Sequence, residues 1–256
     1  MTPGVIFGSG NSGGNFKCER TDDIELCLRA KQRYPCPRDP DGSYVDPDGN
    51  FRVPTGSGVD ADLAFVGRAN WNFDWHVNTD ITGTSGLKIG DFDYRIAVDS
   101  DPGCGTCFAE TFPMLPGRFS APDNDFGNNT FTTSQGINFG EALAAGFPKN
   151  SLEAAVEAET AVADYYQPLL EQFNVAQNSK NFGFPDVGLR NYDPKRPGVY
   201  EIALSIGKFV VDPFSDPASC PSPGFPSPPV PTFVEFFRVT ATVTVDPHQD
   251  PQFNCP

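Results

Sequence analysis

Three short segments of the chain place side-chain oxygens at every second position, next to turn-forming glycines or prolines. Calcium is bound by six to eight oxygen atoms in a flexible geometry, so loops of this kind are candidate calcium sites. None of the three has the spacing of an EF-hand, and Asp-x-Asp segments also form ordinary turns in which the aspartate binds its own backbone. Both interpretations stay open. The candidate ligands are Asp46, Asp48 and Asn50, then Asp99 and Asp101, then Asp123 and Asp125.

Cysteine is the second residue type with chemical potential. The chain has seven cysteines, at positions Cys18, Cys27, Cys36, Cys104, Cys107, Cys220 and Cys255. In a loop-rich, acidic chain they predict disulfides formed in an oxidising compartment. Because seven is odd, we expect one thiol to be free, bonded to another molecule, or paired with a segment that this sequence does not include. Cys104 and Cys107 have the spacing of redox and zinc motifs, but they stand in a Gly/Pro-rich loop, and we expect disulfides there instead.

No catalytic residue can be assigned from the sequence. The chain has two histidines, His76 and His248, and no G-x-S-x-G nucleophile elbow. Catalytic triads and paired catalytic carboxylates are defined by geometry and not by spacing, so a site of either kind would not be visible at this level.

The charge of the chain excludes one large class of partners. Its 256 residues include 33 acidic and 18 basic side chains, which gives a net charge of −15. Nucleic acids need an excess of Lys and Arg to replace their counterions, so we expect no nucleic-acid binding. No apolar run approaches the ~20 residues of a membrane span. Aspartate supplies 23 of the acidic residues, and eight of these precede proline, which places most of the charge in turns and loops.

Alternation of apolar and polar residues predicts β-strands. The predicted strands are 24–31, 71–78, 91–98, 200–206 and 233–245, with shorter ones at 5–7 and 209–211. Both tryptophans fall in 71–78, which we expect at the centre of the core, with Asn72, Asp74, His76 and Asn78 on a solvated face. One wet face is typical of antiparallel sheets. The sequence therefore predicts an all-β fold, an antiparallel β-sandwich with long loops.

Two segments interrupt this pattern. Residues 151–166 are rich in Ala and Glu and follow a possible N-cap at Ser151, which predicts one inserted helix. Residues 215–232 are proline-rich and typical of a polyproline II segment. Because strand residues follow that segment, we interpret it as an insertion within one domain that spans 1–256.

Read in order, several motifs resemble secreted bacterial surface proteins of the PEP-CTERM type. The motifs are ELCLRAKQRY at 25–34, WNFDW at 71–75, NTD at 78–80, TSG at 84–86, DFDY at 91–94, VD at 98–99, DP at 101–102, NVAQNS at 174–179, FGF at 182–184, YDP at 192–194 and GVYEIAL at 198–204. The expected C-terminal anchor of that class is not found, the cysteines and the helix at 141–173 look like additions, and the proline-rich insertion at 215–232 is unfamiliar in that class. The resemblance implies export and a β-rich surface or matrix protein, and it implies no reaction.

These observations favour a secreted or cell-surface structural protein, a matrix or filament subunit that associates with itself or with an extracellular matrix or glycan. One alternative is a calcium-dependent carbohydrate-binding or adhesion module, suggested by the Asp-rich loops and the aromatic residues. A second is a hydrolase whose site is assembled only by the fold.

Overall fold

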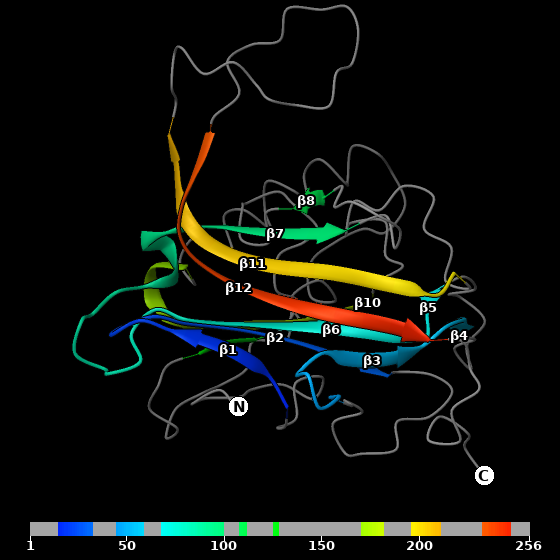
Figure 1. Cartoon of the computed structure of the whole chain (residues 1–256). Helices are drawn as coiled ribbons and strands as arrows, with labels where there is room; N and C mark the ends of the chain where they lie inside the picture. The colour runs from blue at the N-terminus through cyan, green and yellow to red at the C-terminus, as the bar shows by residue number, and fades with distance from the viewer. Residues whose placement is uncertain are drawn as a thin grey trace, which may run out of the picture.

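The structure, a computed structural model, describes residues 15–32, 45–58, 68–99, 108–111, 125–127, 170–181, 196–210 and 232–246. Within these ranges most residues belong to β-strands (Figure 1). The strands are β1 (Lys17–Arg20), β2 (Glu25–Gln32), β3 (Phe51–Pro54), β4 (Ser57–Gly58), β5 (Arg68–Ala69), β6 (Trp71–Asn78), β7 (Asp93–Asp99), β8 (Phe108–Thr111), β9 (Asp125–Gly127), β10 (Val175–Asn181), β11 (Gly198–Val210) and β12 (Thr232–Asp246). A 3-10 turn, η1 (Ile89–Asp91), precedes β7.

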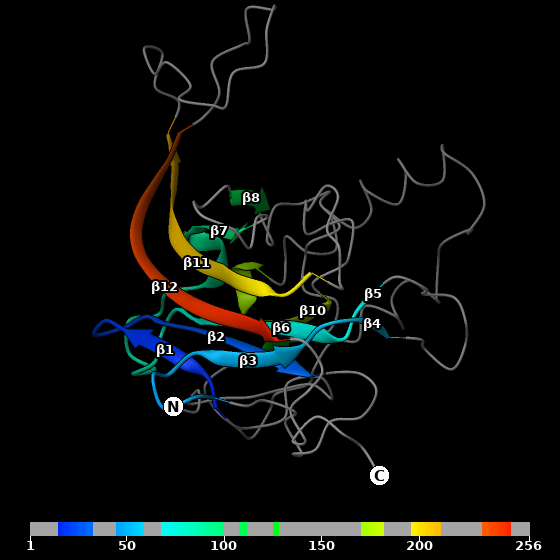
Figure 2. The same ribbon diagram turned by 45° about the vertical axis from the view of Figure 1, so that its right-hand side comes forward.

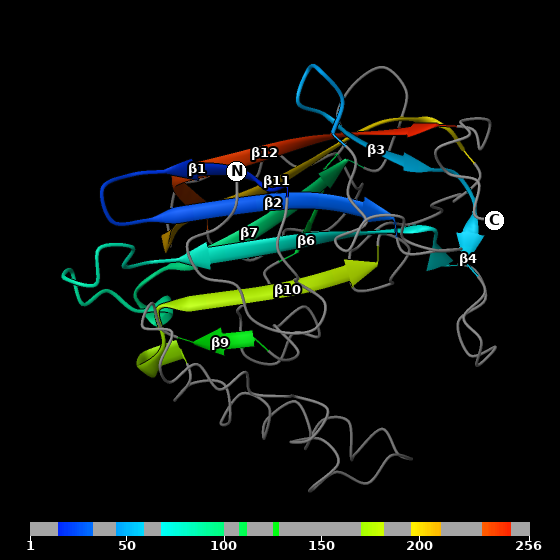
Figure 3. The ribbon, with the colours of Figure 1, turned by 90° about the horizontal axis from the view of Figure 1, so that it is seen from below.

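The strands form two five-stranded sheets and a two-stranded ribbon of β4 and β5. The first sheet has the order β1-β2-β6-β10-β9, and Figure 3 shows these strands side by side. The second sheet has the order β3-β12-β11-β7-β8. Neighbouring strands run antiparallel except β3 and β12, which are parallel. The predicted all-β fold with antiparallel sheets is confirmed.

One apolar core lies between the two sheets. The first sheet contributes Leu26, Leu28, Trp71, Phe73, Trp75 and Val77, and the second contributes Tyr94, Ile96, Val98, Tyr200, Ile202, Leu204 and Val239. The rings of Trp71 and Tyr200 meet across the core with centroids 6.3 Å apart. The Tyr94 hydroxyl donates to the carbonyl of Ile89 at 2.9 Å. Burial, with the charges of Asp91 and Asp93 nearby, raises the pKa of Tyr94 well above its ordinary value.

β11 and β12 pair over their whole length and extend past β7 as a curved two-stranded arm (Figure 2). We define the arm as residues 207–210 and 232–236. The register shifts at its base, because Phe237 lies opposite Ile206 whereas Glu235 lies opposite Gly207. Phe236 is thus the extra residue of a β-bulge, a feature that bends a strand and redirects a side chain. The separate strand predicted at 209–211 is, up to Val210, the end of β11.

The solvated face predicted for 71–78 is wrong. The bounds of β6 are as predicted, and Trp71, Phe73, Trp75 and Val77 do face the core. However, four polar residues of this strand are buried as well, and each has at most 2% of its surface exposed. They are Asn72, Asp74, His76 and Asn78. These polar side chains can be buried because each has hydrogen-bond partners. The partners are Ser179 and Asn181 for Asn72, Arg29 for Asp74, Glu25 and Gln177 for His76, and Asn174 for Asn78. The helix predicted at 151–166, the strand at 5–7 and the proline-rich segment up to 231 lie outside the described residues.

Candidate functional site

The outer face of the first sheet is a buried layer of polar side chains. Register places residues of β1, β2, β6 and β10 in rows across this face, for example Cys18, Cys27, His76 and Gln177. Because paired residues on neighbouring antiparallel strands share a face, each row brings together side chains far apart in sequence. Two clusters of ionisable groups result, one around His76 and one around Asp74.

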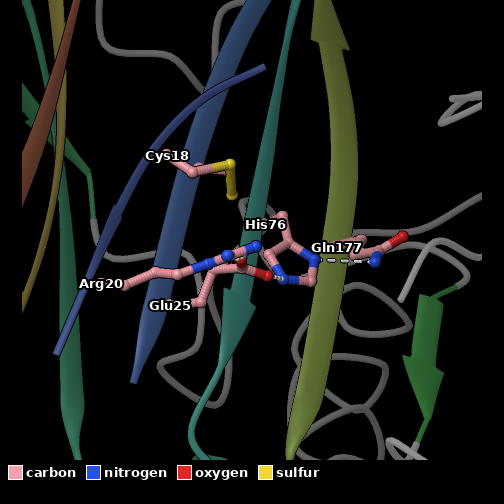
Figure 4. The surroundings of a disulfide bond; sticks show 6 residues. Cys18, Arg20, Glu25, His76 and Gln177 are labelled. Carbon is pink, nitrogen blue, oxygen red and sulfur yellow. Dashed lines mark hydrogen bonds and ion pairs between the residues drawn. A yellow bond between two sulfur atoms is a disulfide. The ribbon is translucent and has the colours of Figure 1, made fainter. Parts of the chain in front are cut away.

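The first cluster is a chain of hydrogen bonds across four strands, which Figure 4 shows from Arg20 to Gln177. Arg20 of β1 pairs with Oε2 of Glu25 on β2. Oε1 of Glu25 lies 3.0 Å from Nε2 of His76 on β6, and Nδ1 of His76 lies 2.7 Å from Nε2 of Gln177 on β10. Glu25, His76 and Gln177 are each only 1% exposed, whereas the side chain of Arg20 is 42% exposed. This chain of hydrogen bonds therefore leads from the exposed Arg20 into the interior of the protein.

These contacts fix the proton on His76. Because the amide of Gln177 donates to Nδ1, the proton of the neutral ring is on Nε2, and Nε2–H donates to Glu25. A general base needs a nitrogen lone pair that is open to its substrate. Both ring nitrogens of His76 are engaged, so this arrangement favours positioning of Glu25 over proton transfer.

A disulfide joins Cys18 to Cys27, which lie in the same register row as His76 and Gln177. Cys27 is fully buried and lies opposite His76 in the sheet register, whereas Cys18 is half-buried on β1. In the described part of the chain, Cys18, Cys27 and Glu25 form the group of potential metal ligands whose donor atoms all lie within 4.8 Å of one another. Cys18 also lines an open pocket of about 370 Å³ between β1 and residues 45–51, which Phe16, Asp48 and Phe51 line as well.

The second cluster surrounds a buried carboxylate. Oδ2 of Asp74 accepts from Nε of Arg29 at 2.9 Å and from Nζ of Lys31 at 2.8 Å. Arg29 and Asp74 are both 0% exposed, and the guanidinium of Arg29 also stacks on the ring of Phe16 at 4.3 Å. The carboxylate of Asp74 thus contacts two cations in a buried setting, so its removal would leave both without this contact.

Asp80, after the end of β6, organises the turn before η1. Its carboxylate accepts hydrogen bonds from the backbone N–H of Ser85 at 3.0 Å and of Gly86 at 3.2 Å. Burial alone would raise the pKa of Asp80, but hydrogen bonds from Ser85, Gly86 and Thr84 outweigh it and leave the pKa below its ordinary value. The carboxylate therefore acts as an anion that holds the turn.

The candidate calcium ligands are placed as follows. Oδ1 of Asp46 accepts from the backbone N–H of Asp48 at 3.0 Å and of Asn50 at 2.9 Å, which is the geometry of an Asx-turn. Asp99 is buried at the end of β7. Asp125 begins β9, whereas Asp101 and Asp123 lie outside the described residues. The same holds for Cys36, Cys104, Cys107, Cys220 and Cys255, and for His248.

The chain of hydrogen bonds around His76 was not predicted from the sequence, since Glu25 and His76 are 51 positions apart and only strand pairing brings them together. One signal was present in the sequence. The alternate positions of 71–78 carry Asn, Asp, His and Asn in place of the long Lys and Glu side chains typical of a solvated face. Short polar residues of this kind are suited to cross-strand hydrogen bonds.

Among the described residues, no helix has the length and apolar character needed to cross a membrane. Comparison with known proteins finds no family model, no curated protein and no solved structure that matches this chain.

Proposed function

We propose that this protein is a secreted or cell-surface structural protein that associates with further copies of itself through the arm of β11 and β12. The observation that supports this most is the exposure of Phe236, which is 59% accessible at the bulge. Val210 and Val234 on the same arm are 41% and 42% exposed. Clustered exposed apolar side chains mark interaction surfaces, whereas isolated ones are ordinary.

The two faces of the arm differ. One face is tied to the sandwich, because Phe209 and Phe233 stack with ring centroids 5.3 Å apart and Arg95 of β7 lies over the Phe233 ring. Arg95 also pairs with Glu235 at 2.9 Å. The other face carries Lys208 opposite Val234 and Val210 opposite Thr232. The exposed valines are therefore on the face that points away from these contacts.

The part of β12 that lies in the arm also forms an edge of the second sheet within the described ranges. β12 pairs with β11 along one side for its full length, but on its other side β3 reaches only 243–246 within the described ranges. The edge of a sheet can accept a strand from another chain through its backbone N–H and C=O groups. A second copy is the partner we propose, because two copies of the arm would place the same exposed apolar side chains and the same strand edge against one another.

One further observation supports an extracellular setting, and the net charge predicts how association depends on salt. The Cys18–Cys27 disulfide is typical of proteins from oxidising compartments. The acidic surface keeps a chain soluble at high concentration, although it also makes copies repel one another. Since added salt screens this repulsion over about 10 Å at 0.1 M, association through an apolar arm should strengthen with salt.

Sedimentation of the purified protein at increasing concentration tests the proposal. We expect oligomers that dissociate on dilution, and Phe236→Ser should shift them towards monomer. Val199→Ser is the matched control, since Val199 is 51% exposed on β11 but lies opposite Thr244, far from the arm. A wild-type protein that stays monomeric at high concentration and high salt would contradict the proposal, as would equal effects of the two substitutions.

A further inference from the structure

We propose that two copies of the chain join by antiparallel pairing of residues 232–236 of β12 with the same segment of the second copy, around a two-fold axis at Val234. This inference rests on the self-association proposed above and specifies its geometry. Figure 2 shows the arm of β11 and β12 projecting from the sandwich, and residues 232–236 are the part of β12 that belongs to it. The direction of the backbone groups, the charges and the sequence on either side of this segment select one register.

The backbone of the arm determines which groups point away from β11. The carbonyl oxygen of Val234 lies against Gly207 of β11, so Val234 turns its backbone groups towards β11. Successive residues of an antiparallel strand turn these groups to opposite sides, so those of Phe233 and Glu235 point away from β11. Among the described residues, β3 pairs with that side of β12 only at 243–246, beyond the bulge. Phe233 and Glu235 are therefore the residues that form hydrogen bonds with an added strand.

One two-fold register uses both of these residues and keeps like charges apart. With the axis at Val234, Phe233 of each copy lies opposite Glu235 of the other, and both pairs exchange backbone hydrogen bonds. An axis at Glu235 would place the two glutamates directly opposite each other, which destabilises a strand pair. An axis at Phe233 would place Glu235 opposite Pro231, which has no N–H to donate. The axis at Val234 has neither disadvantage.

The same register brings exposed apolar side chains together. Val234 lies opposite Val234 of the second copy in a non-hydrogen-bonded pair, the type in which opposite Cα atoms are only about 4.5 Å apart and side chains are close. Phe236 lies opposite Thr232 of the second copy. Because Val234 and Phe236 are both exposed in the single chain, this pairing removes apolar surface from water at the centre and at both ends of the segment.

The ends of the segment limit the strength and the size of the assembly. The bulge at Phe236 bends β12 at one end, and Pro231 lacks a backbone donor at the other. Pairing is thus confined to residues 232–236, and so short an interface gives a dimer that dissociates on dilution. A two-fold contact uses the edge of each copy once, so this association closes at two copies, and growth beyond a dimer requires a different surface.

Opposite charges at position 234 test the axis. Val234→Glu and Val234→Lys each place like charges opposite one another, and each should raise the dissociation constant of the dimer at least about tenfold in sedimentation experiments. An equimolar mixture of the two variants should restore the dimer, because the introduced glutamate then lies opposite the introduced lysine. Thr232→Glu and Thr232→Lys are the matched control. Position 232 lies opposite Phe236 and not opposite itself, so mixing this pair should restore nothing.

A disulfide between copies gives a second readout. Val234→Cys should link two chains at position 234 on mild oxidation, because a Cα separation of about 4.5 Å suits a disulfide. Mass spectrometry of the linked peptides identifies this bond whatever the other cysteines do. Thr232→Cys should give no such link between the two positions 232, which are offset by four residues, or about 14 Å, in this register.

The outcomes separate this inference from the proposed function. A dimer that is restored by mixing the Val234 variants and linked at position 234 supports both. Wild-type oligomers that show neither the restoration nor the link overturn this pairing and leave self-association in place. Equal links at positions 232 and 234 also overturn it. A protein that stays monomeric at high concentration and high salt overturns this inference together with the proposed function.

Discussion

Gly207 of β11 and Val234 of β12 approach so closely that a Cβ atom at position 207 would stand 2.1 Å from the carbonyl oxygen of Val234. This added Cβ atom would also lie 2.9 Å from the ring of Phe233. The bulge that exposes Phe236 begins at this point, so the absence of a side chain at position 207 allows the arm to take its shape.

Gly207→Ala should therefore distort the arm. The added methyl group meets backbone, which cannot rotate away, and overpacking of this kind costs about 1–3 kcal/mol of unfolding free energy. Denaturant unfolding and sedimentation should show lower stability and weaker self-association. Lys208→Ala is the control for stability, because Lys208 is exposed on the adjacent position. Equal stability of the two variants would show that the strands separate here at no cost.

The Cys18–Cys27 disulfide should stabilise the edge of the first sheet. It closes a loop with a sequence separation of nine, and a loop of this size corresponds to about 2–3 kcal/mol of lost chain entropy in the unfolded state. The double variant Cys18→Ser/Cys27→Ser should unfold at correspondingly lower denaturant concentration. A change below about 0.5 kcal/mol would mean that β1 contributes little to the folded state.

The cluster around Asp74 should respond asymmetrically to substitution. Asp74→Leu removes the carboxylate that both Arg29 and Lys31 contact, and loss of one partner in a buried ion pair costs about 3–5 kcal/mol. Arg29→Met in the same chain should restore part of that stability, since the buried guanidinium that Asp74 contacted is then removed as well. Unfolding of both single variants and the double variant measures the coupling, and strictly additive losses would contradict it.

Stability at acid pH should depend on Asp80. Its pKa in the folded state lies below the ordinary value of 3.8, so the carboxylate stabilises the fold above that value and loses this effect as pH falls through the folded pKa. Asp80→Asn should lower stability at neutral pH and make the loss at acid pH less steep. Denaturant midpoints measured over this pH range test both effects, and parallel curves for the two proteins would contradict the assignment.

The turn at Asp46 offers a distinction between an Asx-turn and an ion site. Asp46→Asn keeps an oxygen that can accept from the amides of Asp48 and Asn50, so stability should change little. Asp46→Ala removes that acceptor, and each lost hydrogen bond is worth about 0.5–1.5 kcal/mol. If Asp46→Asn were instead as harmful as Asp46→Ala, and only when calcium is present, the turn would be an ion site.

The sequence predicted the core strands well because their large residues alternate. In β6, for example, Trp71, Phe73, Trp75 and Val77 leave one possible inner face. By contrast, β10 was not predicted, since its residues Asn178 and Lys180 stand on the same face as Ala176 and remove the apolar alternation. Tertiary contacts decide the structure of such a strand, and a local pattern does not contain them.

The candidate site was predicted only in part. The cysteines suggested a disulfide, and Cys18–Cys27 is one. The partners of His76 were not predictable, because the pairing of β2 with β6 and of β6 with β10 determines which polar side chains meet. A rule based on residue spacing can identify a motif within one strand or helix. The hydrogen bonds around His76 instead join residues of four strands, β1, β2, β6 and β10.

The polar layer of the first sheet also restricts how its strands can slide. A shift of β6 by one residue would turn Asp74 and His76 towards the core and Trp75 towards the polar layer. The shift would thus be opposed on both faces, by loss of apolar packing on one and by separation of ion pairs on the other. Sheets with a hydrated outer face have only the first of these restraints, so the polar layer makes the alignment of β2, β6 and β10 doubly determined.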